Sequence, residues 1–111
     1  MRIKPVEWLG DSRERVREFS DEARGDVGFE LWEVQQGKEP SNWKPMPSIG
    51  LGVKEIRVRA GEAYRLIYVA RFSEAVYVLH AFEKKSRKTS RPDVELARNR
   101  FRALVRERRQ R

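Results

Sequence analysis

Three consecutive runs with the two-residue alternation of β-strands constrain this chain more than any other feature. They occupy residues 54–59, 64–68 and 76–82. The segments between them, residues 60–62 and 71–74, are short enough for hairpin turns, so an antiparallel meander is the simplest topology. A sheet of this kind needs helices packed against at least one face.

Helical patterns lie on both sides of these runs. Residues 3–9 predict a short opening strand, and two helices, or one helix kinked near residue 20, follow it. Residues 90–93 open a last helix, and residues 106–111 predict a frayed, charged tail. The order of these elements predicts the α+β class. The apolar face of the last helix consists of Val94, Ala97, Phe101, Leu104 and Val105.

The segment before the meander, residues 37–52, is rich in Pro, Gly, Ser and Asn and predicts a loop. It nevertheless carries apolar side chains that we expect to be buried: Trp43, Met46, Ile49 and Leu51. Trp43, like Trp32 before it, is expected either in the core or facing a protein partner. We therefore expect the loop to pack over the core.

Length and charge limit the function classes. The 111 residues suit one domain, residues 1–111, and the net charge of +8 favours partners with phosphate backbones, anionic membrane surfaces or acidic proteins. No apolar run is long enough to span a bilayer or to form a signal peptide, so we expect a cytoplasmic protein. With no cysteine and a single histidine, the sequence predicts no disulfide, metal site or other cofactor.

Many of the positive charges fall on the predicted sheet. Alternation projects Arg57, Arg59 and Arg65 from its strands, and further cations follow the last strand directly: Lys84, Lys85, Arg87 and Lys88. Cations held on a rigid sheet predict a site for a polyanion. The alternative is that they are solvated strand and loop residues, with Arg57 and Arg65 paired to Glu55 and Glu62.

Several phrases of the sequence resemble the RelE/HigB toxin superfamily, and more narrowly its phage-derived, HigB-like branch. They lie at residues 43–46, 50–57, 64–68, 78–82, 84–85 and 88–89, and together they span most of the chain. The resemblance implies a microbial-RNase-like fold, with an antiparallel sheet, two N-terminal helices and a C-terminal helix. It also implies a type II toxin that enters the ribosome and cuts mRNA, and an antitoxin of the helix-turn-helix type that silences it.

The resemblance implies roles for individual residues. Arg57 falls where the family has a strand cation near the attacking hydroxyl, Arg65 where it has a phosphate-stabilising arginine, and Lys84 and Lys85 where basic residues follow the last strand. Relatives can carry lysine at the first position as a base, whereas an arginine is a poor proton acceptor, so the base stays open. The residues expected to bind RNA without reacting are Lys54, Arg59, Tyr64, Tyr68, Arg87 and Lys88.

Two groups remain candidates for proton transfer. Lys85 can act as an acid, or as a base if neighbouring cations lower its pKa, and His80 is the only side chain that titrates near neutrality without perturbation. Because the alternation places His80 with Val78 and Phe82, a core histidine is the stronger expectation.

These residues leave three functions open. The first is a ribosome-dependent endoribonuclease that attacks through the ribose 2′-hydroxyl. The second is a gyrase inhibitor similar to the ParE toxins, which share the fold. The third is a basic module that binds RNA without cutting it.

Overall fold

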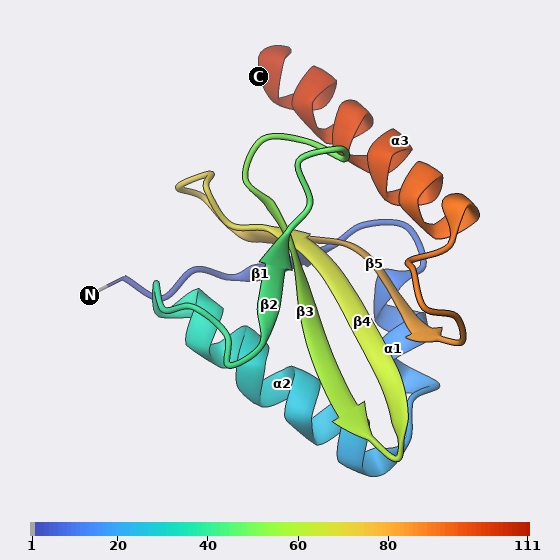
Figure 1. Ribbon diagram of the computed structural model, residues 1–111. Coiled ribbons are helices and arrows are strands. Elements are labelled where there is room, and N and C mark those ends of the chain that lie inside the picture. Colours follow the sequence, from blue (N-terminus) through green and yellow to red (C-terminus); the bar gives the residue numbers. More distant parts are fainter. Residues whose placement is uncertain (1) are drawn as a thin grey trace.

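The computed structural model describes residues 2–111, which form five strands and three helices (Figure 1). None of the helices in this range is long and apolar enough to cross a membrane. Two helices precede most of the sheet and one follows it, which confirms the predicted α+β class. In chain order the elements are β1 (Val6–Trp8), α1 (Ser12–Arg17), α2 (Asp21–Gln35), β2 (Trp43–Pro45), β3 (Val53–Ala60), β4 (Glu62–Val69), β5 (Val76–Lys84) and α3 (Arg91–Arg109).

The strands form one mixed sheet in the order β1-β5-β4-β3-β2. β3, β4 and β5 pair antiparallel, which confirms the predicted meander, and β1 adds to β5 in parallel. The prediction of a loop over residues 37–52 is wrong at β2, because Trp43 pairs with Ile56 and extends the sheet beyond β3. Because β1 is parallel to β5, the sheet is mixed rather than purely antiparallel.

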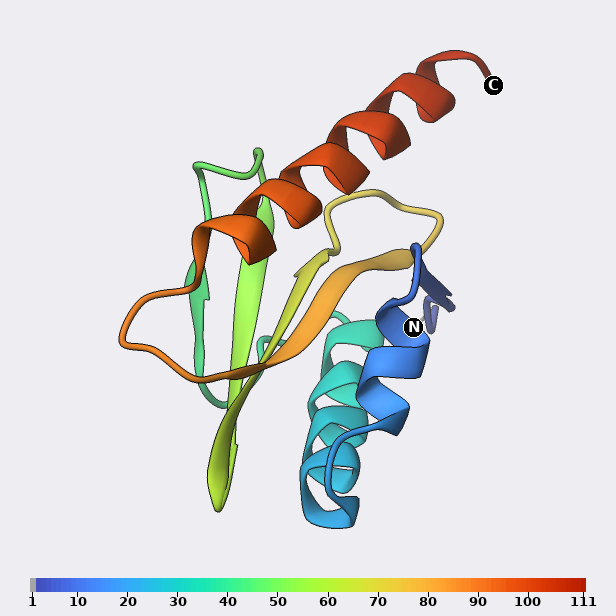
Figure 2. The ribbon, with the colours of Figure 1, turned by 90° about the vertical axis from the view of Figure 1, so that its right-hand side faces the viewer.

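Helices cover both faces of the sheet, as Figure 2 shows: α1 and α2 lie on one side and α3 on the other. We call these the α2 side and the α3 side. On the α2 side the core includes Val27, Leu31, Ile56, Leu66 and Val78. On the α3 side it includes Val53, Ile67, Leu79, Phe101 and Leu104. The apolar face predicted for the last helix is therefore confirmed.

A β-bulge at Leu79 decides which side chains of β5 face α3. Tyr68 of β4 pairs with Val78 and the preceding Ile67 pairs with His80, so Leu79 is left without a partner on β4. Such an extra residue reverses the alternation that follows it. His80 therefore faces the α3 side, whereas Val78 lies in the core of the α2 side. The prediction that these two residues share a face is wrong.

The loop before β3 packs over the core as predicted, with one exception. Met46 and Ile49 are buried and Trp43 is half-buried, whereas Leu51 is 76% exposed, so its predicted burial is wrong. Gly50 lies against the ring of Phe101, where an added Cβ would come within 2.2 Å of the ring. This contact fixes the loop on α3.

The predicted frayed tail is also wrong in its first part, because α3 continues to Arg109. Arg108 holds this last turn against the loop before β5. Its Nε donates to Glu74 Oε2 at 2.6 Å, and its guanidinium lies 3.8 Å from the centre of the Phe72 ring. The positive charge of Arg108, which contributes to the prediction of a frayed tail, instead holds the end of α3 in place.

Candidate nucleic-acid interface

Three of the predicted cations project from the α3 side of the sheet, at the end that α3 does not cover. Arg57 pairs with Arg65 across β3 and β4, and Ala63 pairs with Lys84 across β4 and β5. In Figure 1, α3 crosses the opposite end of these strands, away from the turn between β3 and β4. The bulge at Leu79 is what brings Lys84 to the same face as the two arginines.

These side chains line a shallow depression that continues onto the loop after β5. We call it the cationic groove, and we define it by Arg57, Arg59, Arg65, Lys84, Lys85 and Arg87. Its walls also include Asn42 and Ser86, and Glu62 is the carboxylate at its rim. Six cations around one concave surface attract a polyanion such as an RNA backbone.

A buried carboxylate forms the floor of the groove. Glu55 is 0% exposed, and its Oε1 lies 3.6 Å from Arg57 Nε and 3.7 Å from Arg65 Nε. On its other side, Thr89 Oγ1 donates a hydrogen bond to Glu55 Oε2 at 2.8 Å. A carboxylate taken out of water is costly unless cations and donors surround it, so these three partners are held to it. Glu55 thereby attracts both guanidinium groups toward one point beneath the groove, through charge and without a hydrogen bond.

The two lysines at the end of β5 differ in their surroundings. Lys84 is half-buried, and burial lowers its pKa, with the positive charge of Arg65 lowering it further. The side chain of Lys85 is 81% exposed, and its Nζ lies 4.0 Å from Glu83 Oε2. Lys84 is therefore the groove cation best placed to release a proton, although the sequence favours Lys85 for proton transfer.

The loop over residues 85–90 carries the remaining cations, and hydrogen bonds of its last two residues hold it in place. Thr89 binds Glu55, and Ser90 caps α3 by accepting a hydrogen bond from the backbone N–H of Asp93 at 3.3 Å. Arg87 lines the cationic groove, whereas Lys88 lies beside the first turn of α3. The loop thus presents Arg87, but not Lys88, to the groove.

His80 is buried beneath the start of α3. Its Nε2 donates to Asp93 Oδ1 at 2.7 Å, and its ring stacks on Phe82 with the centroids 5.1 Å apart. Burial lowers the pKa of His80, and the hydrogen bond that it donates to Asp93 partly opposes that shift. These contacts are those of a histidine that joins α3 to β5, and they leave its ring out of reach of RNA.

Three residues expected to bind RNA lie on the α2 side instead. Tyr68 is buried there, and burial raises the pKa of its hydroxyl. Lys54 donates to Glu39 at 2.9 Å and lies over the Trp43 ring, away from the arginines. Tyr64 is also largely buried, against Phe19. We leave Tyr68 and Lys54 out of the proposed RNA contacts.

A family model described as Phage derived protein Gp49-like matches residues 14–102. The chain belongs to the Gp49-like family. Membership is consistent with a toxin that pairs with an antitoxin. The matched range contains every residue of the cationic groove. No curated protein is similar enough in sequence to count as a relative.

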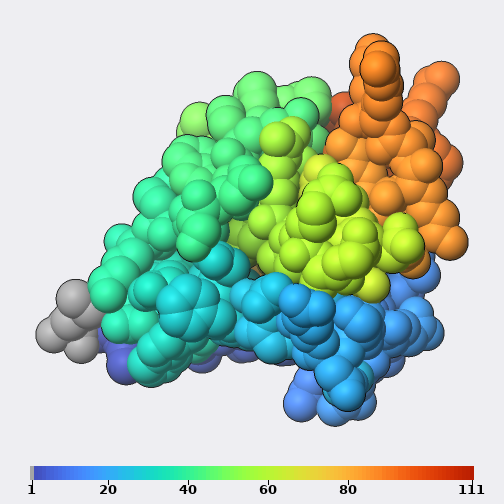
Figure 3. Space-filling view, turned by 60° about the horizontal axis from the view of Figure 1, so that its bottom comes forward, coloured from blue at the N-terminus to red at the C-terminus, as the bar shows by residue number. Residues whose placement is uncertain are grey.

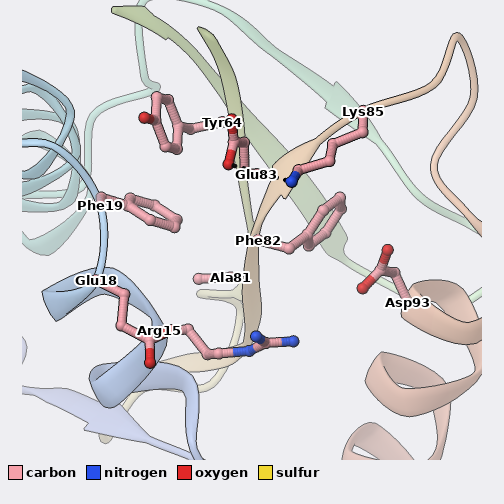
Figure 4. Close-up of a pocket in the computed structure, with 9 residues that line it drawn as sticks. All are labelled: Arg15, Glu18, Phe19, Tyr64, Ala81, Phe82, Glu83, Lys85 and Asp93. Carbon is pink, nitrogen blue, oxygen red and sulfur yellow. Dashed lines mark ion pairs between the residues drawn. The ribbon is translucent and has the colours of Figure 1, made fainter.

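The Gp49-like chain has a second concavity beside the groove, shown in Figure 4. It follows the edge of β5 beyond the three residues that pair with β1. Figure 4 shows the side chains that line it, which come from α1 and the turn after it, from β4, from β5 and the residue after it, and from the start of α3: Arg15, Glu18, Phe19, Tyr64, Ala81, Phe82, Glu83, Lys85 and Asp93. Lys85 lines both concavities, so the two adjoin at the end of β5.

Sequence reasoning misses two parts of this Gp49-like site. Glu55 enters it only as a partner of the two arginines, not as the buried floor, and Thr89 enters it only through a family phrase. A signal for Glu55 is its place in the alternation with Arg57, which puts both on one face. Nothing in the sequence marks Thr89, because its partner lies 34 residues away.

Proposed function

We propose that this Gp49-like protein is the toxin of a type II toxin-antitoxin pair, and that it acts in the cytoplasm as a ribosome-dependent endoribonuclease. The observation that carries the proposal is the cationic groove. Arg57, Arg65 and Lys84 share one face of a sheet, and the buried Glu55 attracts both guanidinium groups. The family match supports the toxin role.

In the proposed reaction the ribose 2′-oxygen bonds to the adjacent phosphorus, and the bond from phosphorus to the 5′-oxygen breaks. The products are a 2′,3′-cyclic phosphate and a free 5′-hydroxyl. Arg57 and Arg65 stabilise the charge on the nonbridging oxygens in the transition state. Lys84 in its neutral form takes the 2′-hydroxyl proton, which its lowered pKa favours, and protonated Lys85 gives a proton to the leaving 5′-oxygen.

A second candidate is a module that binds RNA through the same groove without cutting it. The observation that favours it is the burial of His80, because the groove then contains no side chain whose ordinary pKa lies near neutrality. Binding by this route depends mainly on the release of counterions, so it weakens steeply with salt.

The test is expression of the chain without its antitoxin, with the 5′ ends of cellular mRNA mapped. We expect growth arrest and new 5′ ends within translated mRNA. Because Arg65 contributes charge stabilisation to the transition state, Arg65→Ala should lower the cleavage rate by about a hundredfold to a thousandfold. Arg106→Ala removes an equal charge from an exposed position on α3 and serves as the matched control.

The outcomes separate the candidate functions. Cleavage that is lost in Arg65→Ala and kept in Arg106→Ala supports the ribonuclease. RNA binding with no new 5′ ends supports the binding module, and arrest with altered DNA supercoiling supports a gyrase inhibitor. Equal cleavage by both variants contradicts the proposed site.

A further inference from the structure

α2 carries large apolar side chains on the face that points away from the sheet. Its inner face is already buried through Ala23, Val27, Leu31 and Val34. On the outer face, Phe29 is 56% exposed and Trp32 is 46% exposed. Isolated exposed apolar residues are normal, but these two lie one helical turn apart, on a helix whose core contacts are complete.

The backbone of α2 is also exposed on this outer face, at its two glycines. Gly25, Phe29, Trp32 and Gln36 follow one another at steps of four, three and four residues, which is the spacing of a helix-pairing seam. A Cβ added at Gly25 or Gly28 would meet nothing within 4 Å, so no contact within residues 2–111 requires these glycines. Glycine within a helix is destabilising relative to alanine. In Figure 3, α2 crosses the lower part of the molecule with no segment over its outer side.

The charge on α2 is opposite to that of the whole chain. The helix contains five carboxylates and one arginine, within a chain of net charge +8. Arg24 pairs with Asp21, and Lys38 pairs with Glu33. Glu22 and Asp26 have no ion-pair partner among the described residues, and they lie along one flank of the aromatic pair.

This charge decides what can cover the face. Nucleic acid and anionic lipid are repelled by it. Glu30 is buried and accepts a hydrogen bond from Ser41, which leaves four carboxylates on each α2. Pairing of two α2 helices from two copies of the chain therefore concentrates eight carboxylates against two arginines, which opposes a symmetric dimer. A partner helix with apolar anchors and lysine or arginine on its flank complements both features.

We infer that the outer face of α2, formed by Gly25, Phe29 and Trp32 with Glu22 and Asp26 on its flank, docks a positively charged amphipathic helix of a partner protein. That partner is the antitoxin, an identity that rests on the proposed function. The face lies on the other side of the sheet from the cationic groove, so the two sites can be altered separately (Figure 2).

The chemistry is tested with two synthetic helical peptides that carry leucine at heptad spacing. One has lysine on its flanks, and the other has glutamate in place of each lysine. We expect the cationic peptide to bind the full chain, and Phe29→Ser/Trp32→Ser to weaken that binding by about a hundredfold. The net charge of +8 by itself predicts the opposite preference, so long-range attraction cannot produce this result.

Two matched variants sharpen the peptide test. Leu51→Ser removes an apolar side chain that is 76% exposed elsewhere, and it should leave binding unchanged. Glu22→Lys/Asp26→Lys should weaken the cationic peptide by about tenfold and strengthen its anionic twin. Failure of the cationic peptide to bind, or equal binding to the parent chain and the aromatic variant, overturns the docking site.

The identity of the partner is tested with purified antitoxin and calorimetry, in chains that also carry Arg65→Ala so that toxicity does not interfere. We expect Phe29→Ser/Trp32→Ser to bind the antitoxin about a hundredfold more weakly, with thermal unfolding unchanged because both side chains are exposed. Undiminished binding overturns the assignment to the antitoxin. A dimer of the parent chain that this variant dissolves overturns it in favour of a second copy. Absence of mRNA cleavage by the wild type contradicts the proposed ribonuclease and alters neither binding result.

Discussion

The α3 side of the sheet has two halves that differ sharply in chemistry. Where α3 covers it, the strands present Val53, Ile67 and Leu79 to Phe101. Two residues further along β3 the same face presents Glu55. Both positions are buried, one under an apolar helix and the other under arginines.

The difference shows that a buried strand position does not need an apolar cover. Over Glu55 the cover consists of the guanidinium groups of Arg57 and Arg65 together with the hydroxyl of Thr89. A cover of cations is open to an anionic ligand, which a helix is not. The covered half therefore supplies stability, and the open half presents the candidate site.

The largest expected effect breaks the covered half. Phe101→Ala removes a ring that packs against Gly50 and the core of the α3 side, and it should lower the free energy of unfolding by about 3–5 kcal/mol. Urea unfolding measures this change. Arg59→Ala is the control from the open half, because Arg59 is exposed and forms no ion pair with Glu55, and its loss of stability should be much smaller. Equal losses in the two variants would mean that the halves are not separate in function.

The next effect tests the floor of the open half. Glu55→Gln keeps a buried acceptor for Thr89 but removes the charge that attracts the arginines, so kcat should fall by about tenfold. Because a negative charge is lost from beneath the groove, RNA affinity should stay the same or increase. Single-turnover cleavage and RNA titration measure the two quantities separately.

Glu62→Gln is the matched control for this split. It removes the same charge from the rim of the groove, where Glu62 is exposed and contacts neither arginine closely enough for an ion pair. RNA affinity should increase and kcat should stay unchanged. If Glu55→Gln behaves in the same way, Glu55 contributes only charge and does not position the arginines.

Local patterns predict the covered half well and the open half only in part. The meander and the apolar face of α3 follow from periodicity and turn residues, which act over a few positions. Local patterns do not predict β2, because a strand of three residues that includes Pro45 exists only through its pairing with β3. Local patterns also do not predict the bulge. Residues 76–82 are nearly all apolar, so no polar position marks the reversal of the alternation at Leu79.

The site depends on these hidden features. The sequence predicts that Arg57, Arg65 and Lys84 are important, but their common face requires the bulge. The burial of Glu55 depends on a partner across the sheet and on a loop far along the chain, and neither leaves a local signal. The sequence pattern does not distinguish Tyr68 from a strand tyrosine that contacts RNA, yet Tyr68 is buried beneath α2.

A smaller effect concerns the junction of the two halves, where His80 joins β5 to α3. Burial holds the pKa of His80 in the folded chain below its ordinary value of 6.5, so the unfolded chain binds the proton more readily. The stability from this site is therefore complete above pH 6.5 and is lost as the pH falls below it. Since one proton is involved, the slope can reach about 1.4 kcal/mol per pH unit at most. Urea unfolding as a function of pH should show this slope in the wild type and lose it in His80→Gln, whose amide can still donate to Asp93; an unchanged slope would assign the pH dependence to other groups.

The smallest effect concerns the loop that closes the open half. Thr89→Val removes the hydrogen bond to Glu55, which should cost about 1 kcal/mol and speed amide exchange over residues 85–90. RNA affinity should fall by only about fivefold, because Arg87 is then less firmly held at the groove while Arg57 and Arg65 stay in place. Thr89→Ser keeps the hydroxyl and should restore both properties. If Thr89→Val leaves both properties unchanged, the methyl group of Thr89 holds the loop by packing, and the open half owes less to Glu55 than its geometry indicates.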